Sequence, residues 1–440
     1  MAKVLPKGHS KLIRAWAFYD WANSVYSLVI SSAIFPIFYG ALTLVKNDNG
    51  EVINDQVQFL GFSINNDSLI SYVTAFAFLC ISILSPLLSG IADYIGNKRV
   101  YMKFFNYLGA ISCIGLYWFN MEHLELGLLC YFFGLIGFWG SIVFYNSYLP
   151  DIAFKDQQDK ASAQGFSLGY FGSVLLLLIC LAMIMNYAYF GFESSAEPTR
   201  ISFILTGIWW IGFSQYAYYY LPKSFKKNKY SKAVLFNGFK EIKKVFKQIK
   251  NIPTLHRYLG AFFVYSMAVQ TIMLVATYFG IEEINWSGQD ETSGLIISIL
   301  LIQLVAIAGA YLAAKLASQF GNILVLIYIN SIWVGICIYA FFMETPTDFY
   351  IAAFFVGLVM GAIQSLSRST YAKLLPETTE TTSFFSFYDV TEKIGIVVGM
   401  FIFGLISHLT DSMRNSVIFL VVFFVIGILL LLRIPKKARI

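Results

Sequence analysis

The stretch Ser89-Gly90-Ile91-Ala92-Asp93-Tyr94-Ile95-Gly96-Asn97-Lys98-Arg99 ends one long apolar run and leads into the next. Gly96 permits a tight turn between two helices, and Gly90 lets a neighbouring helix approach closely. Asp93 can pair with Lys98 or Arg99 and so close one side of a pathway. Alternatively, this is a plain turn whose basic residues only orient the chain in a membrane. Both interpretations place a loop between two membrane helices here.

Parts of this turn recur later in the chain. Gly321-Asn322-Ile323-Leu324-Val325 lies 225 residues after Gly96-Asn97-Lys98-Arg99-Val100. Leu375-Pro376-Glu377 lies 226 residues after Leu149-Pro150-Asp151. Because the two offsets agree to within one residue, we expect two homologous halves of six spans each.

The composition is that of an integral membrane protein. Of the 440 residues, 58% are hydrophobic and only 13% are charged, whereas about a quarter of a soluble domain is charged. Apolar runs of roughly 20 residues, each long enough to cross a bilayer, recur along the chain. The expected spans are roughly 14–44, 67–93, 102–120, 124–150, 165–190, 201–221, 258–281, 292–317, 322–343, 349–375, 384–409 and 415–433. We expect an all-α membrane fold of twelve helices, the first tilted or kinked near Pro36.

Basic residues fix the expected orientation. Alternating the loops between two sides puts 28 of the 31 Lys and Arg on the side of both termini, leaving Lys46, Arg200 and Arg414 opposite. The positive-inside rule therefore predicts cytoplasmic termini, in a bacterial-type inner membrane. The formal charge of +6 is then a topology signal and implies no nucleic acid. Met1 to Ser10 has no secretory signal pattern, so we expect the first span to be retained.

A basic linker separates the expected halves. Residues 222–257 carry eleven Lys and Arg against the single acid Glu241. Its apolar residues recur at helical spacing, as in a helix on an anionic membrane surface: Leu235, Phe239, Ile242, Phe246 and Ile249. The alternative is a solvated connector. We expect an N-terminal half at 1–221, this linker at 222–257 and a C-terminal half at 258–440.

Several motifs resemble those of the major facilitator superfamily. The stretch 89–99 keeps the Asp, the second Gly and the basic pair of that superfamily's Gly-x-Leu-Ala-Asp-x-x-Gly-x-Lys-Lys signature, with the first Gly displaced to Gly90. A narrower resemblance, to the vacuole-effluxer-like branch, covers nearly the whole chain. It rests on four stretches: Arg14-Ala15-Trp16-Ala17-Phe18-Tyr19-Asp20-Trp21-Ala22-Asn23-Ser24, Phe144-Tyr145-Asn146-Ser147-Tyr148-Leu149-Pro150-Asp151, Gly361-Ala362-Ile363-Gln364-Ser365-Leu366-Ser367-Arg368-Ser369 and Phe385-Ser386-Phe387-Tyr388-Asp389-Val390.

This resemblance implies a twelve-helix permease that works as a monomer. In this superfamily the substrate sits near the midplane, between two halves that rock alternately. Fungal members of the branch are similar proteins that release amino acids from vacuoles, which suggests amino acids as the substrate class.

Asp20 is the first candidate for a transport role. A charged side chain inside a bilayer costs about 2.5 to 3.5 kcal/mol on insertion scales, so such a group is a functional candidate. Asp20 lies several residues inside the first span, beside Tyr19 and Asn23. We hypothesise that Asp20 binds a proton or a substrate amine. The alternative is a structural role near the cytoplasmic interface, such as pairing with Arg14.

Charged residues also occur in the tenth and eleventh spans. Asp389, Glu392 and Lys393 stand at i, i+3 and i+4, so Asp389 and Lys393 can pair on one helix face. Glu392 then either meets Arg368 in a structural pair, which we favour, or exchanges a proton during the cycle. The full set of cytoplasmic gate candidates is Gly90, Asp93, Gly96, Lys98, Arg99, Arg368, Asp389, Glu392 and Lys393.

Uncharged polar residues inside the spans complete the candidates. They either line a small cavity and bind a polar solute or join helices to one another. The full set of substrate or proton-coupling candidates is Tyr19, Asp20, Asn23, Tyr145, Asn146, Tyr265, Gln270, Gln303 and Gln364.

Other functions lack a sequence pattern. The five cysteines lie unpaired in apolar runs and the four histidines are scattered, so we expect no metal and no enzymatic centre. No phosphate-binding loop is present, so we expect no cofactor and, if transport is coupled, an ion gradient. The preferred function is a secondary transporter of a small polar solute. The alternatives are an exporter of amphipathic compounds or a receptor or scaffold that uses the basic linker.

Overall fold

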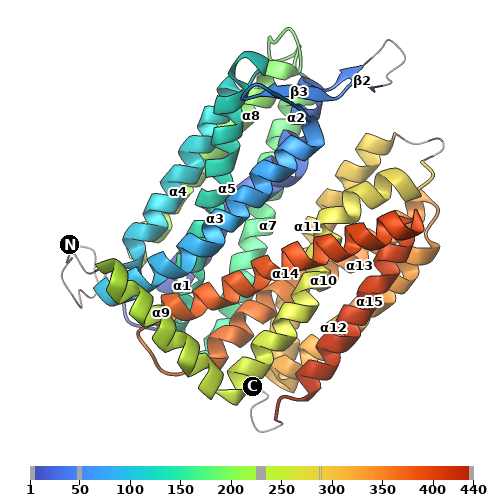
Figure 1. Cartoon of the computed structure of the whole chain (residues 1–440). Helices are drawn as coiled ribbons and strands as arrows, with labels where there is room; N and C mark the ends of the chain where they lie inside the picture. Colours follow the sequence, from blue (N-terminus) through green and yellow to red (C-terminus); the bar gives the residue numbers. More distant parts are fainter. Residues whose placement is uncertain (1–4, 47–51, 224–233, 287, 289, 436–440) are drawn as a thin grey trace.

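The computed structural model describes residues 5–46, 52–223, 234–286, 288 and 290–435, and the chain forms two bundles of long helices within them (Figure 1). The N-terminal half contains α1 Ser10–Val25, α2 Phe35–Thr43, α3 Asn66–Ile95, α4 Lys98–Gly115, α5 Leu124–Asn146, α6 Leu149–Ile152, α7 Lys155–Met185 and α8 Ala196–Tyr220. The C-terminal half contains α10 Pro253–Glu283, α11 Glu291–Phe320, α12 Asn322–Phe342, α13 Pro346–Leu374, α14 Thr381–Thr410 and α15 Met413–Leu432. In the sequence, α9 Val234–Asn251 lies between the two halves.

The expected twelve-helix membrane fold is confirmed. Ten helical segments of the described residues are long and apolar enough to cross a membrane. The third and sixth spans, α4 and α8, pack against α5 and α1 within the same bundle. Helix α1 begins and α15 ends at the same end of the molecule, below termed the terminal side (Figure 1).

The first span changes helix type before Pro36. After α1, residues Tyr26–Ile34 form a π-helix, and α2 continues the segment with Pro36 in its first turn. Proline cannot donate an amide hydrogen bond to the preceding turn, and a π-helical insertion is one of the known ways to accommodate such a break. The irregularity expected near Pro36 therefore takes this form.

Both repeated turns place a glycine at a positive φ angle. Gly96 ends α3 with φ 80°, and Gly321 precedes α12 with φ 85°. These positive φ angles are favourable only for glycine, which explains why both turns carry it.

Helix ends differ from the predicted spans where polar residues are helical. Helix α7, which forms the fifth membrane span, begins at Lys155, ten residues before the predicted start at 165. Hydropathy detects only the apolar part of a helix, whereas the polar first turns of α7 pack on the terminal side. Similarly, α10 begins at Pro253, within the stretch assigned to the linker.

On the side opposite the termini, two short hairpins follow the first span. Strand β1 Val45–Lys46 pairs antiparallel with β2 Val52–Asn54, and β3 Gln56–Phe59 with β4 Phe62–Asn65. Asn65 then caps α3 by accepting from the backbone N–H groups of Asp67 and Ser68. The hairpins thus lead directly into the second span.

Small residues allow close helix contacts within each half. A Cβ on Gly137 of α5 would lie 2.4 Å from the Cα of Gly109 in α4, and a Cβ on Gly361 of α13 would lie 2.0 Å from the carbonyl oxygen of Ala306 in α11. Such small-residue contacts are the usual way in which membrane helices pack closely.

Candidate functional site

A buried ion pair joins the two halves. Arg368 of α13 donates from Nη1 to the Oδ2 atom of Asp20 in α1 at 3.2 Å. The hydroxyl of Tyr145, from α5, donates to the same Asp20 oxygen at 2.7 Å. Asp20 and Arg368 are only 7% and 3% exposed. The expected alternative partner of Asp20, Arg14, is therefore not the one that the structure shows.

The guanidinium of Arg368 is held on several sides. Its Nη1 donates to Oδ1 of Asn146 at 3.2 Å, and Nε and Nη2 donate to the hydroxyl and carbonyl oxygens of Ser162, each at 2.9 Å. Its central carbon lies 4.1 Å from the ring centroid of Phe166 and 4.9 Å from that of Trp16. A planar group with hydrogen bonds around its edge and aromatic rings nearby is strongly oriented.

A glycine provides the space for this pair. A Cβ on Gly165 would lie 2.5 Å from Oδ2 of Asp20 and 2.9 Å from Nη2 of Arg368. Any larger residue would therefore displace the charged groups.

The favoured pairing of Glu392 with Arg368 is wrong. Glu392 instead accepts a hydrogen bond from Nε2 of Gln270, in α10, at 2.7 Å. The pairing fails because Arg368 is already paired with Asp20 from the other half. Spacing within one sequence does not indicate such a distant partner. Asp389 and Lys393 pair as expected, and Nζ of Lys393 lies 5.2 Å from the ring centroid of Trp139 in the N-terminal half.

The remaining central candidates fall into two groups. Three contribute to contacts: Tyr265 shares a 2.8 Å hydrogen bond with Ser367, Gln364 accepts from Tyr170 across the halves at 2.6 Å, and the Tyr19 ring packs 4.9 Å from that of Tyr145. Two others leave buried atoms, Nδ2 of Asn23 and Oε1 of Gln303, without a hydrogen-bond partner among the described residues. Such atoms are suited to bind a polar solute, because they gain a hydrogen bond at little cost.

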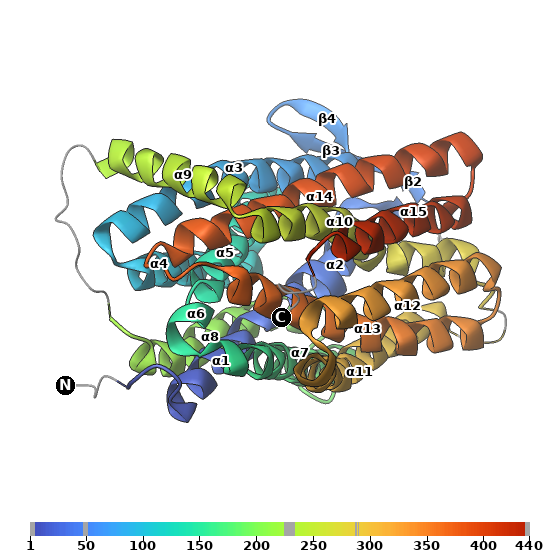
Figure 2. The same cartoon turned by 90° about the horizontal axis from the view of Figure 1, so that it is seen from below.

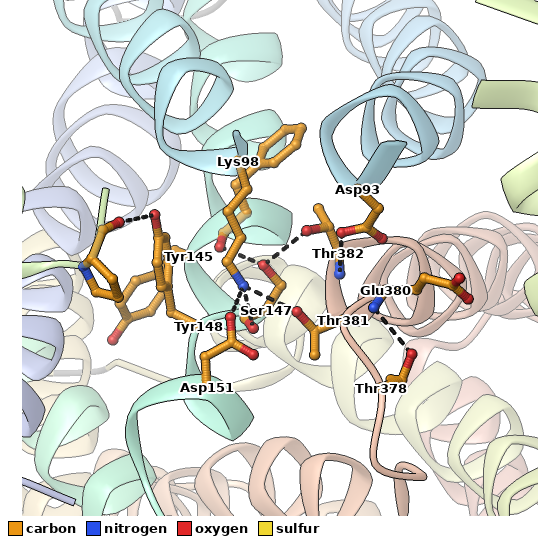
Figure 3. Close-up of polar contacts among 12 residues, drawn as sticks. Asp93, Lys98, Tyr145, Ser147, Tyr148, Asp151, Thr378, Glu380, Thr381 and Thr382 are labelled. Carbon is orange, nitrogen blue, oxygen red and sulfur yellow. Dashed lines mark hydrogen bonds and ion pairs between the residues drawn. The ribbon is translucent and has the colours of Figure 1, made fainter. Parts of the chain in front are cut away.

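A second set of contacts joins the halves at the terminal side (Figure 3), and we call it the inter-half cluster: Asp93, Lys98, Ser147, Asp151 and Thr381 to Ser383. The first interpretation expected Asp93 to pair with Lys98 or Arg99, and the structure shows neither ion pair within 4 Å among the described residues. Asp93 accepts from the backbone N–H groups of Thr382 at 3.3 Å and Ser383 at 2.6 Å. These N–H groups belong to the first turn of α14, and the partial positive charge of a helix N-terminus favours a carboxylate there.

The basic pair of the motif has two separate roles. Nζ of Lys98 lies 2.5 Å from Oδ2 of Asp151 and donates to Oγ1 of Thr381 at 3.0 Å, so it reaches the other half. Arg99 stays within the N-terminal half, where it donates to the carbonyl oxygens of Tyr218 and Leu221. Gly96 lies in the turn between α3 and α4. Gly90 contacts α9, since a Cβ there would lie 2.3 Å from the carbonyl oxygen of Gly238.

Sequence reasoning missed a neighbouring group of contacts. Lys373 of α13 pairs with Asp159 of α7, and the amide of Asn322 donates to Asp159 at 2.8 Å. Asp159 lies in the polar stretch that hydropathy assigned to a loop, which is why it was not a candidate. Ser162, in the same stretch, was missed for the same reason.

Two six-helix halves that meet through buried polar contacts are the architecture of the major facilitator superfamily (MFS). The solved MFS transporter FucP, in the outward conformation, has this fold: the TM-score is 0.69 at 12% identity, covering 97% of this chain and 98% of that one. The proton:xylose symporter XylE is similar as well, with a TM-score of 0.69 at 13% identity over 97% of this chain and 95% of its own.

Sequence comparison places the chain more narrowly. It belongs to the vacuole effluxer Atg22-like family, whose model matches residues 8–439. The uncharacterized MFS-type transporter YxiO of Bacillus subtilis is 33% identical over 98% of this chain and 96% of its own length. Autophagy-related protein 22 of Saccharomyces cerevisiae is 25% identical over 84% of this chain and 78% of its own. The chain is therefore an integral membrane transporter of the MFS type and not an enzyme.

Proposed function

We propose that this protein is a secondary active transporter that moves a small polar solute, with amino acids as the first candidates, by alternating access. The Asp20–Arg368 pair between the two halves carries this proposal. In the proposed setting the membrane is a bacterial inner membrane and both termini are cytoplasmic, which agrees with the YxiO relative and with the distribution of Lys and Arg.

The pair offers both charges that a zwitterion needs. An amino acid carries an ammonium group, which Asp20 can bind, and a carboxylate, which the guanidinium of Arg368 can bind through two parallel hydrogen bonds. Separating the pair leaves two buried charges, and a solute with complementary charges compensates for both. Asn23 and Gln303, with their unpartnered atoms, are proposed to bind the rest of the solute.

The inter-half cluster supports alternating access. Lys98, Asp93 and Arg368 each bond to the opposite half at or toward the terminal side, so this side is held closed. Opening toward it requires these bonds to break. We propose that the inter-half cluster is the cytoplasmic gate. The other gate candidates from the sequence are Gly90, Gly96, Arg99, Asp389, Glu392 and Lys393.

A coupling proton is part of the proposal. Glu392 is bonded to a neutral amide, Gln270, rather than to a cation, so this pair can persist when the carboxyl is protonated. The structural neighbour FucP is described as a fucose:proton symporter, and XylE as a proton:xylose symporter, which fits an ion-driven mechanism.

The test is counterflow in proteoliposomes loaded with pooled amino acids, with and without an imposed pH gradient. Wild-type protein should accumulate labelled amino acids saturably. The double variant Asp20→Asn with Arg368→Gln removes both charges without leaving either one unpaired, so it should fold but fail to transport. Asp67→Asn, at the exposed start of α3, is the matched control.

Two results would contradict the proposal. If no pool supports counterflow by folded wild-type protein, amino acids are not the substrate. If the double variant transports at the wild-type rate, the ion pair is not the substrate site.

A further inference from the structure

Helix α9 leaves three phenylalanines exposed on its surface. Its buried residues, Gly238, Val245 and Ile249, face the protein. The side chains of Phe236, Phe239 and Phe246 are 61%, 60% and 55% exposed. The spacing of 3 and 7 residues places these three rings on one face of a helix. Some residues of the basic linker lie outside the described residues. These are the side chain of Leu235, one of the apolar residues at helical spacing, and the lysines at 226, 227, 229 and 232.

Lysines flank the three rings. Lys240, Lys243, Lys244, Lys247 and Lys250 are all exposed, and Nζ of Lys240 lies 4.5 Å from the centroid of the Phe236 ring. Glu241 is the only acid within α9. A face of exposed aromatic rings bordered by lysines is complementary to an anionic lipid surface, where rings enter the headgroup boundary and ammonium groups meet phosphates.

The position of α9 fits the edge of a membrane. Exposed apolar residues of α3, Tyr72, Phe76, Leu79 and Ile83, recur at helical spacing and mark its outer face. Gly90 continues that face seven residues after Ile83, and there α9 crosses α3 with the backbone of Gly238 against Gly90.

The same holds for α14. Its exposed residues Ile394, Val397 and Phe401 mark an outer face, and Phe387, seven residues before Ile394, lies on it. The ring of Phe246 packs against Phe387 with a centroid distance of 5.9 Å. Helix α9 thus lies over the terminal-side ends of the outer faces of both helices (Figures 1 and 2).

Helix α9 also contacts both halves at the inter-half cluster. Nζ of Lys244 pairs with Glu380, the residue before α14, and this hydrogen bond raises the pKa of Lys244. Glu380 directly precedes Thr381, the residue that Lys98 reaches from the N-terminal half. A force that holds α9 in place therefore also holds α3 and α14 together.

We propose that the exposed face of α9, formed by Phe236, Phe239, Phe246 and the flanking lysines, binds anionic phospholipid headgroups at the membrane surface. Bound lipid then holds α9 across α3 and α14 and favours the arrangement that is closed on the terminal side. This inference does not depend on which solute is transported.

The depth of α9 in a bilayer tests this proposal directly. Nitroxide labels at Phe239→Cys and, on the protein-facing side, Gln248→Cys would be placed in full-length protein whose five native cysteines are replaced. Nanodiscs of phosphatidylcholine alone and of phosphatidylcholine with phosphatidylglycerol are compared. We expect the label at 239 to become more accessible to oxygen and less accessible to a water-soluble nickel chelate in the anionic discs, with the label at 248 unchanged.

Charge variants separate lipid recognition from general anchoring. Lys240→Gln, Lys243→Gln and Lys247→Gln together should abolish the response of the label at 239 to phosphatidylglycerol. The matched triple variant Lys11→Gln, Lys155→Gln and Lys160→Gln, at exposed lysines away from α9, should keep it. A label at 239 that is equally deep in both lipid compositions, or that stays in water in both, would overturn the proposal.

Discussion

Arg368 of the tenth span donates to Asp20 of the first span, so one buried ion pair spans the interface between the two halves. Residues 348 positions apart in sequence thereby depend on each other. A buried pair is costly to split, because the partner that remains is an unpaired charge in a poorly solvated place. The pair is therefore both a structural contact between the halves and a natural point of control for their separation.

Removing only the cation should destabilise the protein strongly. Arg368→Ala leaves Asp20 without its cation and should cost about 3 to 5 kcal/mol. Arg368→Lys keeps the charge but loses the planar set of donors that bonds Ser162 and Asn146, so a smaller loss is expected. Thermal unfolding in detergent checks this order, with the neutral double variant Asp20→Asn/Arg368→Gln expected to be more stable than Arg368→Ala. Equal stability of Arg368→Ala and wild type would contradict a buried pair.

A single methyl group at position 165 should disturb the same pair. The new Cβ of Gly165→Ala would lie 2.5 Å from the Asp20 carboxylate, so the ion pair must shift. We expect reduced stability and loss of counterflow. Gly212→Ala in α8 is the control, because a Cβ there meets nothing within 4 Å, and alanine is about 0.5 to 1 kcal/mol better than glycine inside a helix. A Gly165→Ala protein that is as active as Gly212→Ala would show that this packing is not needed.

The contact between Asp93 and the start of α14 should be visible in amide exchange. Asp93→Ala removes the acceptor of the Thr382 and Ser383 N–H groups, and loss of such a cap costs about 1 kcal/mol. Hydrogen–deuterium exchange at these amides should therefore rise by about fivefold. Asp290→Ala, which removes the cap of α11 at Ser293, should leave Thr382 and Ser383 unchanged. Unchanged exchange in Asp93→Ala would exclude this contact in the membrane.

Sequence patterns predicted the helices well because membrane spans leave a strong local signal. Apolar runs, the glycine turns at 96 and 321 and the internal repeat identify twelve helices without any knowledge of their packing. The same method failed where a helix begins with polar residues. Asp159 and Ser162 lie in the first turns of α7 and bond to the C-terminal half, but hydropathy assigned them to a loop.

Pairing between residues was harder to predict than their importance. Asp20, Arg368 and Glu392 were all candidates, because charges inside a membrane are rare and expensive. Their partners depend on how distant helices face one another, which a single sequence does not encode locally. The i, i+4 pair of Asp389 and Lys393 was predicted correctly, because both residues lie on one helix.

The correct partner of Glu392 can be established by a double-mutant cycle. Glu392→Ala and Gln270→Ala remove the two ends of one hydrogen bond, so their effects on the free energy of unfolding should be non-additive by about 0.5 to 1.5 kcal/mol. A parallel cycle of Glu392→Ala with Arg368→Ala should give a coupling energy within about 0.5 kcal/mol of zero, because Arg368 bonds Asp20 instead. The reverse pattern would restore the pairing first expected from sequence.

Glu392→Gln adds a functional measurement, since glutamine keeps a hydrogen-bond acceptor for Gln270 but cannot exchange a proton. If Glu392 couples transport to protons, this variant should keep counterflow and lose the effect of the pH gradient, whereas a purely structural Glu392 would leave that effect intact.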